Sequence, residues 1–337
     1  MSERAVQCGE CGGPGDRVYG DLFDRHFEGG GGWAIAHCGR CDLHWLAPTP
    51  TEEQIRASYR DYYTHAGAGG VGFEGWLKHV IPGVCLGYRD RLTPWQLAGG
   101  ALVARVPPLR TLGERSVLWL DGHERGRLLD VGCGSGETML RFRELGWEVG
   151  GVEFDDAAAR VAAERTGAPV VSTLDAVEPA SFDAVILDHV LEHLSDAGSI
   201  LRGCARALRP RGRLALATPN PKSAGRSRFG PNWLHWDPPR HLALRGESGL
   251  RALARETGFE VDDLFSCAGS AHFVWYASRL IEREGRLPGI RVAGLSAKER
   301  LAGLRFWLAE QARVRRGEAC GEEWVLLARR SGASAGP

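Results

Sequence analysis

Residues 127–140, RLLDVGCGSGETML, decide the fold of this chain. The first five residues are typical of a short buried strand, and the stretch then passes through Gly132, Gly134 and Gly136 into a helical pattern. Glycines between a strand and a helix let the backbone approach a ligand closely, and the helix N-terminus offers free N–H groups to an anion. The stretch therefore predicts an α/β fold with a ligand on this turn.

The segments around this stretch repeat its strand-and-helix pattern. Short apolar runs alternate with helical patterns, such as the helix that we expect to stop at Gly146 and the one that we expect to end at Pro210. That alternation favours a doubly wound, mainly parallel sheet with helices on both faces. We place the strands at 127–131, 147–153, 169–172, 182–188, 212–219, 258–267 and 322–330.

The overall composition excludes some classes of protein. The 337 residues hold 42 Lys and Arg against 42 Asp and Glu, so no net charge draws the chain to nucleic acid or anionic lipid, although a local basic patch is allowed. No stretch approaches the roughly 20 apolar residues of a membrane span, and the first ten residues lack a signal-peptide core. We therefore expect a cytoplasmic protein without a membrane span.

Composition divides the chain into three segments. Residues 1–50 are rich in Gly and Cys, 51–125 are largely helical from an N-cap at Thr51, and 126–330 carry the strand pattern. We expect a small zinc-ribbon-like module, a helical collar or lid, and a ligand-binding domain with a helical insertion at about 270–318. Oligomeric state is left open.

Four of the nine cysteines form two tight pairs in the first segment, Cys8-x-x-Cys11 and Cys38-x-x-Cys41. Two such pairs supply four thiolates for tetrahedral Zn²⁺, and metal binding would supply much of the folding energy of a segment so poor in apolar residues. The acidic residues of this segment outnumber its arginines, so we expect a structural zinc module and no RNA binding. Two reduced, metal-free pairs are the alternative.

The turn itself discriminates between nucleotide ligands. Glu137 stands where a dinucleotide-binding fingerprint needs its third glycine. Asp130 would repel a pyrophosphate but attract a ligand with an ammonium and a sulfonium, such as S-adenosylmethionine. Glu153, at the end of the second strand, can accept hydrogen bonds from both ribose hydroxyls in either type of enzyme.

The motifs LLDVGCGSG, VGGVEF, FDAVILDHVLEHL, LRPRGRLALATPN and GFEV closely resemble, in order and spacing, those of class I S-adenosylmethionine-dependent methyltransferases over about residues 125–265. The N-terminal cysteines and WLHWDPPRHLALRGESGLRAL resemble small-molecule methyltransferases with a Cys-rich N-terminal segment, often found with sugar or polysaccharide biosynthesis. The resemblance implies a Rossmann-like seven-stranded sheet whose last strand is antiparallel. It also implies cofactor contacts from Asp130, Gly132, Gly134, Gly136, Glu153, Asp175 (to adenine) and Asp188.

The acceptor is expected at the carboxyl ends of the fourth and fifth strands, where open α/β sheets bind ligands. His241, in the aromatic loop after the fifth strand, is our first choice for acceptor contact or general base. His189 and His193 could act as bases, or could bind a metal together with Glu192, or Glu192 and His193 could simply bond to backbone. Tyr59, Tyr62 and Tyr63 could close over the cofactor, or belong to the core.

These observations predict a methyltransferase acting on oxygen or carbon of a small molecule, with a nucleotide-linked sugar or polysaccharide precursor as one example. The segment LDHV replaces the Asn/Asp-Pro-Pro-aromatic motif of enzymes that methylate nucleobase amines, which disfavours that reaction. Two alternatives stay open, an RNA or protein methyltransferase and a non-catalytic cofactor-binding or scaffold module.

Overall fold

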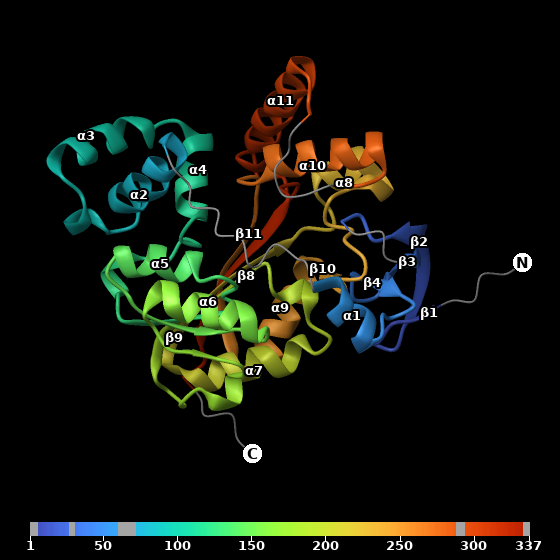
Figure 1. Cartoon of the computed structure of the whole chain (residues 1–337), viewed down its shortest axis with the longest axis horizontal. Helices are drawn as coiled ribbons and strands as arrows, with labels where there is room; N and C mark the ends of the chain where they lie inside the picture. The colour runs from blue at the N-terminus through green and yellow to red at the C-terminus, as the bar shows by residue number, and fades with distance from the viewer. Residues whose placement is uncertain (1–5, 27–30, 60–71, 288–293, 333–337) are drawn as a thin grey trace, which may run out of the picture.

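A computed structural model describes residues 6–26, 31–59, 72–287 and 294–332 (Figure 1). The strands are β1 Val6–Gln7, β2 Pro14–Phe23, β3 Gly31–His37, β4 Leu43–Ala47, β5 Arg127–Val131, β6 Glu148–Val152, β7 Val170–Val171, β8 Phe182–Asp188, β9 Leu208–Pro219, β10 Ala243–Arg245, β11 Phe259–Cys267 and β12 Glu323–Arg330. The α-helices are α1 Glu52–Tyr59, α2 Phe73–Cys85, α3 Pro94–Val103, α4 Pro107–Arg115, α5 Glu137–Glu144, α6 Asp156–Thr166, α7 Ala197–Ala207, α8 Ala224–Phe229, α9 Glu247–Glu256, α10 Ala271–Glu284 and α11 Ala297–Val314.

The main sheet has seven strands in the order β11-β12-β9-β8-β5-β6-β7. β12 runs antiparallel to both of its neighbours, and the remaining pairs are parallel. The expected fold class, with an antiparallel last strand, is confirmed. This topology brings the carboxyl ends of the parallel strands and the start of β12 to one edge of the sheet, which is where open α/β sheets bind ligands.

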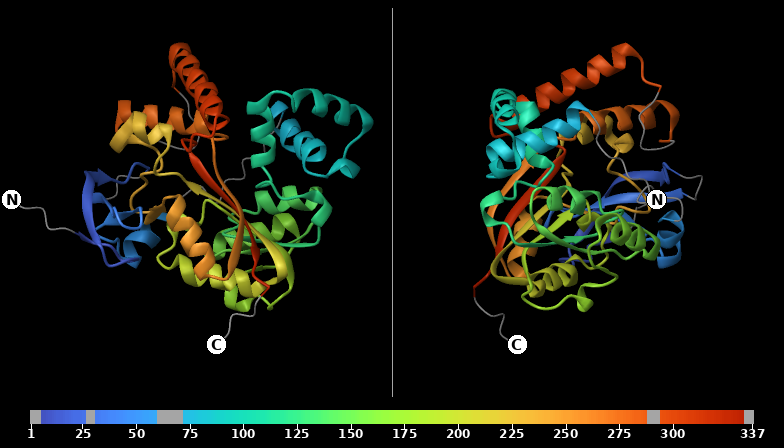
Figure 2. Two further views of the ribbon diagram at one scale, coloured as in Figure 1. Left: turned by 180° about the vertical axis from the view of Figure 1, so that it is seen from behind. Right: turned by 60° about the vertical axis from the view of Figure 1, so that its left-hand side comes forward.

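Alternating side chains of the central strands fill two separate cores. Leu129 and Val131 of β5 pack with residues of α7 and α9, whereas Leu128 packs with Met139 and Phe142 of α5. Helices therefore cover both faces, as Figures 1 and 2 show. Of the described helices, none is both long and apolar enough to cross a membrane.

Two helix boundaries can be compared with their predicted positions. Helix α7 stops at Ala207, three residues before Pro210, because β9 already begins at Leu208 and pairs with β8 from there. The end of α5 agrees with its prediction, since Gly146 follows two residues later with φ 96°.

The first segment forms a second, antiparallel sheet in the order β1-β2-β3-β4-β10. Its last strand comes from the loop after β9, where Ala243, Leu244 and Arg245 pair with β4. Helix α1 then begins after Thr51, whose Oγ1 accepts from Gln54 N at 3.2 Å. Helices α2, α3 and α4 pack together around Leu77, Val80 and Ile81. The loop after β9 therefore connects the two sheets.

Candidate functional site

The glycine turn lies between β5 and α5, and its backbone conformation favours glycine. Gly132, Gly134 and Gly136 have φ values of 75°, 52° and 79°, in the left-handed region that side chains disfavour. A Cβ on Gly132 would lie 2.6 Å from Val190 Cγ2. The turn is held open by Gly134 N, which donates to Glu153 Oε2 at 2.7 Å. The structure thus brings together four of the predicted cofactor-contacting residues.

Asp130, at the end of β5, is a buried carboxyl with an unsatisfied oxygen. Its side chain is 3% exposed, and Oδ2 has no hydrogen-bond partner among the described residues. Burial, reinforced by the charges of Asp188 and Glu153, raises the pKa of Asp130 to about 8. An unpaired buried carboxyl is costly, and a cation placed against it would remove the cost. The residues at this turn therefore fit a cationic sulfonium cofactor.

Glu153 follows β6 directly and is only partly buried. Besides the bond from Gly134, its Oε1 accepts from Asp155 N at 3.0 Å. Each carboxylate oxygen has two lone pairs, so one remains on each oxygen for a hydroxyl donor. The two backbone N–H groups thus orient the Glu153 carboxylate and leave it able to accept further hydrogen bonds.

Among the described contacts, none joins Asp175 to the glycine turn. Its side chain is fully exposed, and its carboxylate lies 3.6 Å from Arg206 Nη2 on α7. An adenine contact therefore stays a prediction.

Asp188, the last residue of β8, is held by Arg115 of α4. Arg115 Nη2 donates to Asp188 Oδ1 at 2.6 Å and Nη1 donates to Oδ2 at 3.2 Å, while Nε donates to Glu323 Oε2 at 2.7 Å. Burial alone would lower the pKa of Arg115, but the two carboxylates outweigh it and raise that pKa. One guanidinium thus joins the collar to the ends of β8 and β12.

His189 does not fit the predicted role of a base. Its Nδ1 lies 3.0 Å from Glu192 Oε1 and its Nε2 lies 2.8 Å from Glu323 Oε1. Burial lowers the pKa of this imidazole, but the two carboxylates raise it overall to about 10, so the ring is an imidazolium at neutral pH. Its φ of 54° is strained for a non-glycine residue. His189 therefore links the two carboxylates and has no lone pair to offer.

Of the three predicted catalytic histidines, His193 and His241 each have one ring nitrogen bonded to a backbone carbonyl. His193 Nδ1 lies 3.1 Å from Arg240 O and 2.8 Å from Tyr59 Oη, and His241 Nδ1 lies 2.8 Å from His235 O. A carbonyl oxygen only accepts, so each Nδ1 carries a proton, and in the neutral form of each ring the lone pair is on Nε2. Burial, together with the charge of His241, lowers the pKa of His193 to about 4. The structure places both predicted histidines together, with ring centroids 4.6 Å apart.

The metal set predicted from the sequence is not the one that the structure assembles. Ligand atoms of Glu192, His193 and His241 lie within 4.8 Å of one another, whereas His189 is occupied by Glu192 and Glu323. Glu192 is fully buried and also accepts from Thr218 Oγ1 at 3.0 Å. His241 therefore replaces His189 in this group.

Charged side chains join the loop after β9 to the N-terminal sheet. Arg240 is fully buried between two carboxylates, donating to Asp24 Oδ1 at 2.7 Å and to Asp237 Oδ1 at 2.6 Å. Both carboxylates raise the pKa of Arg240 against the effect of burial. Lys222 pairs with Asp42 at 2.6 Å, and Arg245 pairs with Glu10.

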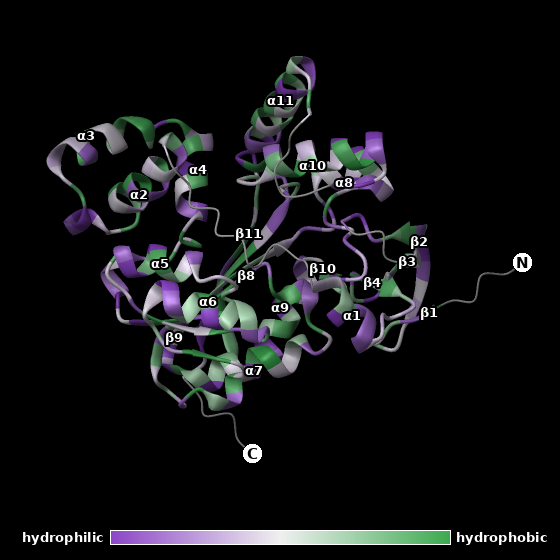
Figure 3. Cartoon of the chain, viewed as in Figure 1, coloured by the Kyte–Doolittle hydropathy of each residue, from purple (hydrophilic) through white to green (hydrophobic). Residues whose placement is uncertain are grey.

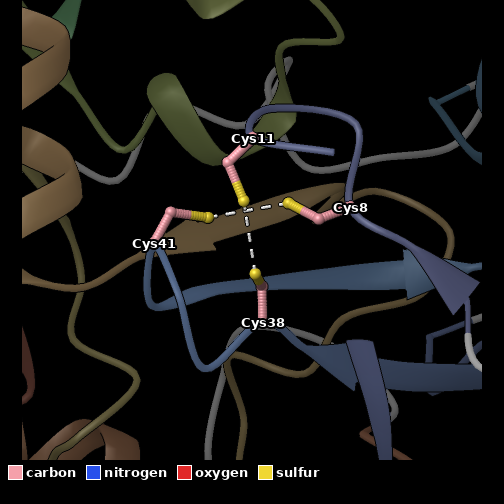
Figure 4. Close-up of side chains that lie close together, drawn as sticks. All are labelled: Cys8, Cys11, Cys38 and Cys41. Carbon is pink, nitrogen blue, oxygen red and sulfur yellow. Dashed lines mark hydrogen bonds between the residues drawn. The ribbon is translucent and has the colours of Figure 1, made fainter. Parts of the chain in front are cut away.

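The four paired cysteines converge at one point, as Figure 4 shows. Their sulfur atoms all lie within 4.8 Å of one another, with Cys8 Sγ and Cys41 Sγ 3.6 Å apart and Cys11 Sγ and Cys38 Sγ 3.4 Å apart. Each pair lies in the same type of turn, since Cys8 N and Cys38 N each donate to the carbonyl oxygen of the residue five positions later. Burial raises the pKa of the Cys8 and Cys41 thiols, so a cation is needed to hold four thiolates here.

Glu10 and Asp42 lie inside or directly after these cysteine turns, and they are the residues that pair with the loop after β9. The position of the acceptor-side loop is thereby tied to the conformation of the cysteine cluster. Tyr59, at the end of α1, contacts His193 through its hydroxyl. Tyr62 and Tyr63 lie outside the described residues.

Sequence reasoning missed Arg115, Glu323 and the Asp24–Arg240–Asp237 cluster. A signal existed for Glu323, because the first residue of an antiparallel last strand must lie at the carboxyl edge of the parallel strands. Arg115 and Asp24 had no such signal, since their partners lie 73 and 216 residues away along the chain.

Comparisons with known proteins agree with this geometry. A family model described as a methyltransferase domain matches residues 105–264. A ubiquinone biosynthesis O-methyltransferase from Pseudomonas aeruginosa is 30% identical over 175 residues, covering 47% of this chain and 75% of that protein. One from Idiomarina loihiensis is 32% identical over 126 residues, covering 34% of this chain and 52% of that protein. This chain thus spans only about half the length of the Idiomarina relative.

A putative sarcosine dimethylglycine methyltransferase structure from Galdieria sulphuraria matches with 20% identity and a TM-score of 0.42, covering 70% of this chain and 88% of that one. The chain belongs to the class I S-adenosylmethionine-dependent methyltransferases. The names of the two O-methyltransferases give no support to the nucleotide-linked sugar or polysaccharide precursor suggested from the sequence, and we do not retain that acceptor.

Proposed function

We propose that this enzyme transfers a methyl group to a hydroxyl oxygen of a small molecule, with His241 as general base. The observation that carries this proposal is that His193 and His241 lie together at the same sheet edge as the glycine turn, with their ring centroids 4.6 Å apart. The bound cofactor would supply an electrophilic methyl group on a sulfonium. Such a transfer needs in-line placement of the acceptor and removal of its proton, and the His241 Nε2 lone pair can receive that proton.

For the cofactor, we propose that Asp130 receives the ammonium group, that the N–H groups of the turn receive the carboxylate, and that Glu153 receives the ribose hydroxyls. The unsatisfied oxygen of Asp130 and the remaining lone pairs of Glu153 support these roles. Asp175 stays the proposed adenine contact. Asp188 is proposed to act through its pairing with Arg115, beside Asp130.

For the N-terminal cysteines, we propose one structural Zn²⁺ bound by Cys8, Cys11, Cys38 and Cys41. The four convergent sulfur atoms and the two matching turns fit tetrahedral coordination. The acidic residues of this module pair with the loop after β9, which supports a structural role over RNA binding. A second metal at Glu192, His193 and His241 is the alternative to base catalysis, and it would activate the acceptor hydroxyl directly.

The test combines cofactor binding with methyl transfer. Calorimetry should show S-adenosylmethionine binding that Asp130→Ala and Glu153→Ala each weaken by about tenfold or more, as expected when a charge-assisted hydrogen bond is lost. The protein, labelled cofactor and a cell metabolite extract should yield a methylated species identifiable by mass. His241→Ala should bind cofactor normally and lose about 10²-fold or more in rate.

The exposed His123 supplies a control, since His123→Ala should change neither binding nor rate. Wild-type turnover by His241→Ala would remove His241 as base. Two metal ions per chain, with one lost in His241→Ala, would favour the metal alternative. Firm cofactor binding with no methylated product would favour a non-catalytic module, and label on RNA or protein would redirect the acceptor assignment.

A further inference from the structure

The exposed apolar side chains of this protein are unevenly distributed. Ten large apolar side chains are exposed in the part of the chain that the structure describes, and six of them lie on α3, on α11 or in the turn that follows α3. We name these six the α3/α11 surface: Trp95, Leu102, Val106, Leu301, Leu304 and Leu308.

The helices that carry this surface lie at one end of the molecule. Figures 1 and 2 are related by turns about the vertical axis, and α3 and α11 stay in the upper part of all three views. Helix α4, which follows α3, contacts α11. Figure 3 shows hydrophobic segments along both helices. The two helices that, together with the turn after α3, carry most of the exposed large apolar side chains therefore lie at the same end of the molecule, whereas single exposed apolar residues scattered over a surface are normal.

Helix α3 has an unusual composition for a helix on the surface. Pro94–Val103 contains no charged residue, and Gly100 is its one buried position. A Cβ on Gly100 would lie 2.9 Å from Val84 Cγ2, so α3 packs closely on α2 through its small residues. The outer side keeps Trp95 at 87% and Leu102 at 66% exposure. Packing within the collar thus uses the small side chains and leaves the large ones outward.

Basic residues outnumber acidic ones in the segments that carry these apolar side chains. Residues 73–114 hold five Lys and Arg against three Asp and Glu, although the whole chain is balanced at 42 each. Helix α11 holds four basic residues against two acidic ones. Of those two, Glu310 is 1% exposed, and burial raises its pKa to about 10, so it carries no charge at neutral pH. This end of the protein therefore combines apolar exposure with local positive charge.

We propose that the α3/α11 surface docks on an anionic lipid bilayer. Exposed Trp and Leu flanked by arginines suit the interface, where the apolar side chains enter the headgroup region and the guanidinium groups meet phosphate. A ten-residue helix is about 15 Å long, so α3 would lie along the membrane surface. The attachment is peripheral, which agrees with the finding on membrane-spanning helices.

A second copy of this chain is the rival occupant, and charge disfavours it. A two-fold contact would place each basic end against the other, and like charges facing each other oppose association. An anionic bilayer offers the opposite charge over a broad area.

Vesicle co-sedimentation of the full chain tests the proposal without relying on its methyltransferase activity. We expect binding to vesicles of phosphatidylcholine with 30% phosphatidylglycerol, and much weaker binding to phosphatidylcholine alone or at high salt. Trp95→Ser/Leu102→Ser should weaken binding by about tenfold or more, because two large side chains no longer leave water. Hydrogen exchange should slow in residues 94–106 and 297–308 when vesicles are added.

The matched control is Phe23→Ser, which removes an exposed apolar side chain from the N-terminal sheet and should leave vesicle binding unchanged. Circular dichroism and thermal unfolding will establish that each variant is folded. The proposal is overturned if anionic vesicles do not bind the wild type, or if the folded double variant binds as well as wild type. It is also overturned if the wild type is a dimer that the double variant dissociates.

Discussion

The cofactor end and the acceptor end of the site share one sheet edge but are stabilised in different ways. The cofactor end consists of contiguous backbone between β5 and α5, with Asp130 left unpaired. At the acceptor end, side chains from distant segments pair with one another, as Arg240 does with Asp24 and Asp237. The cofactor end is thus completed by a cationic ligand, whereas the acceptor end is organised in advance by the protein.

This difference predicts that contacts from the N-terminal sheet affect the acceptor end but not the cofactor end. The N-terminal sheet contacts the loop that carries His235 and His241 but contributes nothing to the glycine turn among the described contacts. Damage to that sheet should therefore separate turnover from cofactor affinity, and the following experiments test that separation.

The largest effect is expected from replacing all four clustered cysteines by Ser. Zinc should fall from about one per chain to none, and the loop after β9 should lose its partner strand β4. Because small misplacements cost about 10²-fold in rate, turnover should fall by at least that factor, while the cofactor dissociation constant changes less than about threefold. Metal analysis, hydrogen exchange of residues 233–245 and calorimetry measure the three quantities.

The control for the cysteine variant is Cys85→Ser, a thiol of α2 outside the cluster. It should keep zinc, turnover and cofactor affinity. A quadruple variant that loses cofactor affinity in parallel with turnover would contradict the independence of the two ends.

A smaller but still large effect is expected from Arg240→Met. The substitution leaves Asp24 and Asp237 buried without their cation, and breaking a buried ion pair in this way costs about 3–5 kcal/mol in the free energy of unfolding. Urea unfolding measures the loss. The matched control is Arg56→Met, which removes an exposed pair with Glu52 and should cost less than about 0.5 kcal/mol. Equal losses in both variants would show that Arg240 is not a structural centre.

Arg115→Met should have an intermediate effect that reaches both ends of the site. Its pair with Glu323 is buried but its pair with Asp188 is partly exposed, so we expect a loss of about 2 kcal/mol. Asp188→Asn in the same chain should recover part of that loss, because Asp188 is the carboxylate that loses its cation in Arg115→Met. A double-mutant cycle with no coupling energy would contradict the role of Arg115 as the link. Cofactor affinity and turnover should both fall, unlike in the cysteine variant.

The sequence was sufficient for the parts of the protein that depend on neighbouring residues. The strand pattern, the glycine turn and the cysteine pairs are local signals, because backbone conformation and ligand spacing are set within a few residues. The role of His189 could not be predicted in this way. Its charge depends on Glu323, 134 residues away, which turns a candidate base into a bound cation.

The pairing of β10 with β4, which joins the loop after β9 to the N-terminal sheet, could not be predicted from a local sequence pattern either. Strand β10 has three residues and pairs with β4, about 200 residues earlier in the chain. Nothing in such a short segment specifies a distant partner, since the pairing is fixed only when Arg240 and Arg245 meet the carboxylates of the N-terminal sheet. The sequence therefore pointed to His193 and His241, which the structure brings together, but not to their partners.

The smallest predicted effect is the release of a single proton when the cofactor binds. It tests whether the Asp130 carboxyl stays protonated until a cationic ligand reaches it. Because burial raises the pKa of Asp130 to about 8, the folded protein without cofactor holds that proton at pH 6.5, where the unfolded chain does not. The folded state then binds more protons, so stability contributed by this group falls as pH rises from about 4 to about 8. An ammonium placed against Asp130 should lower its pKa and expel the proton.

Calorimetry at pH 6.5 in buffers of different ionisation enthalpy should show close to one proton released per S-adenosylmethionine bound, since a group with its pKa more than one unit above the pH is about fully protonated. This pH also keeps the cofactor's own amino group protonated, so that group adds little to the balance. Asp130→Asn should bind cofactor more weakly with no proton release, whereas the cysteine variant should release the proton as wild type does. A wild-type binding enthalpy independent of buffer would mean that Asp130 is already ionised before the cofactor binds. In that case the charges of the cofactor end, like those of the acceptor end, would be compensated within the protein itself.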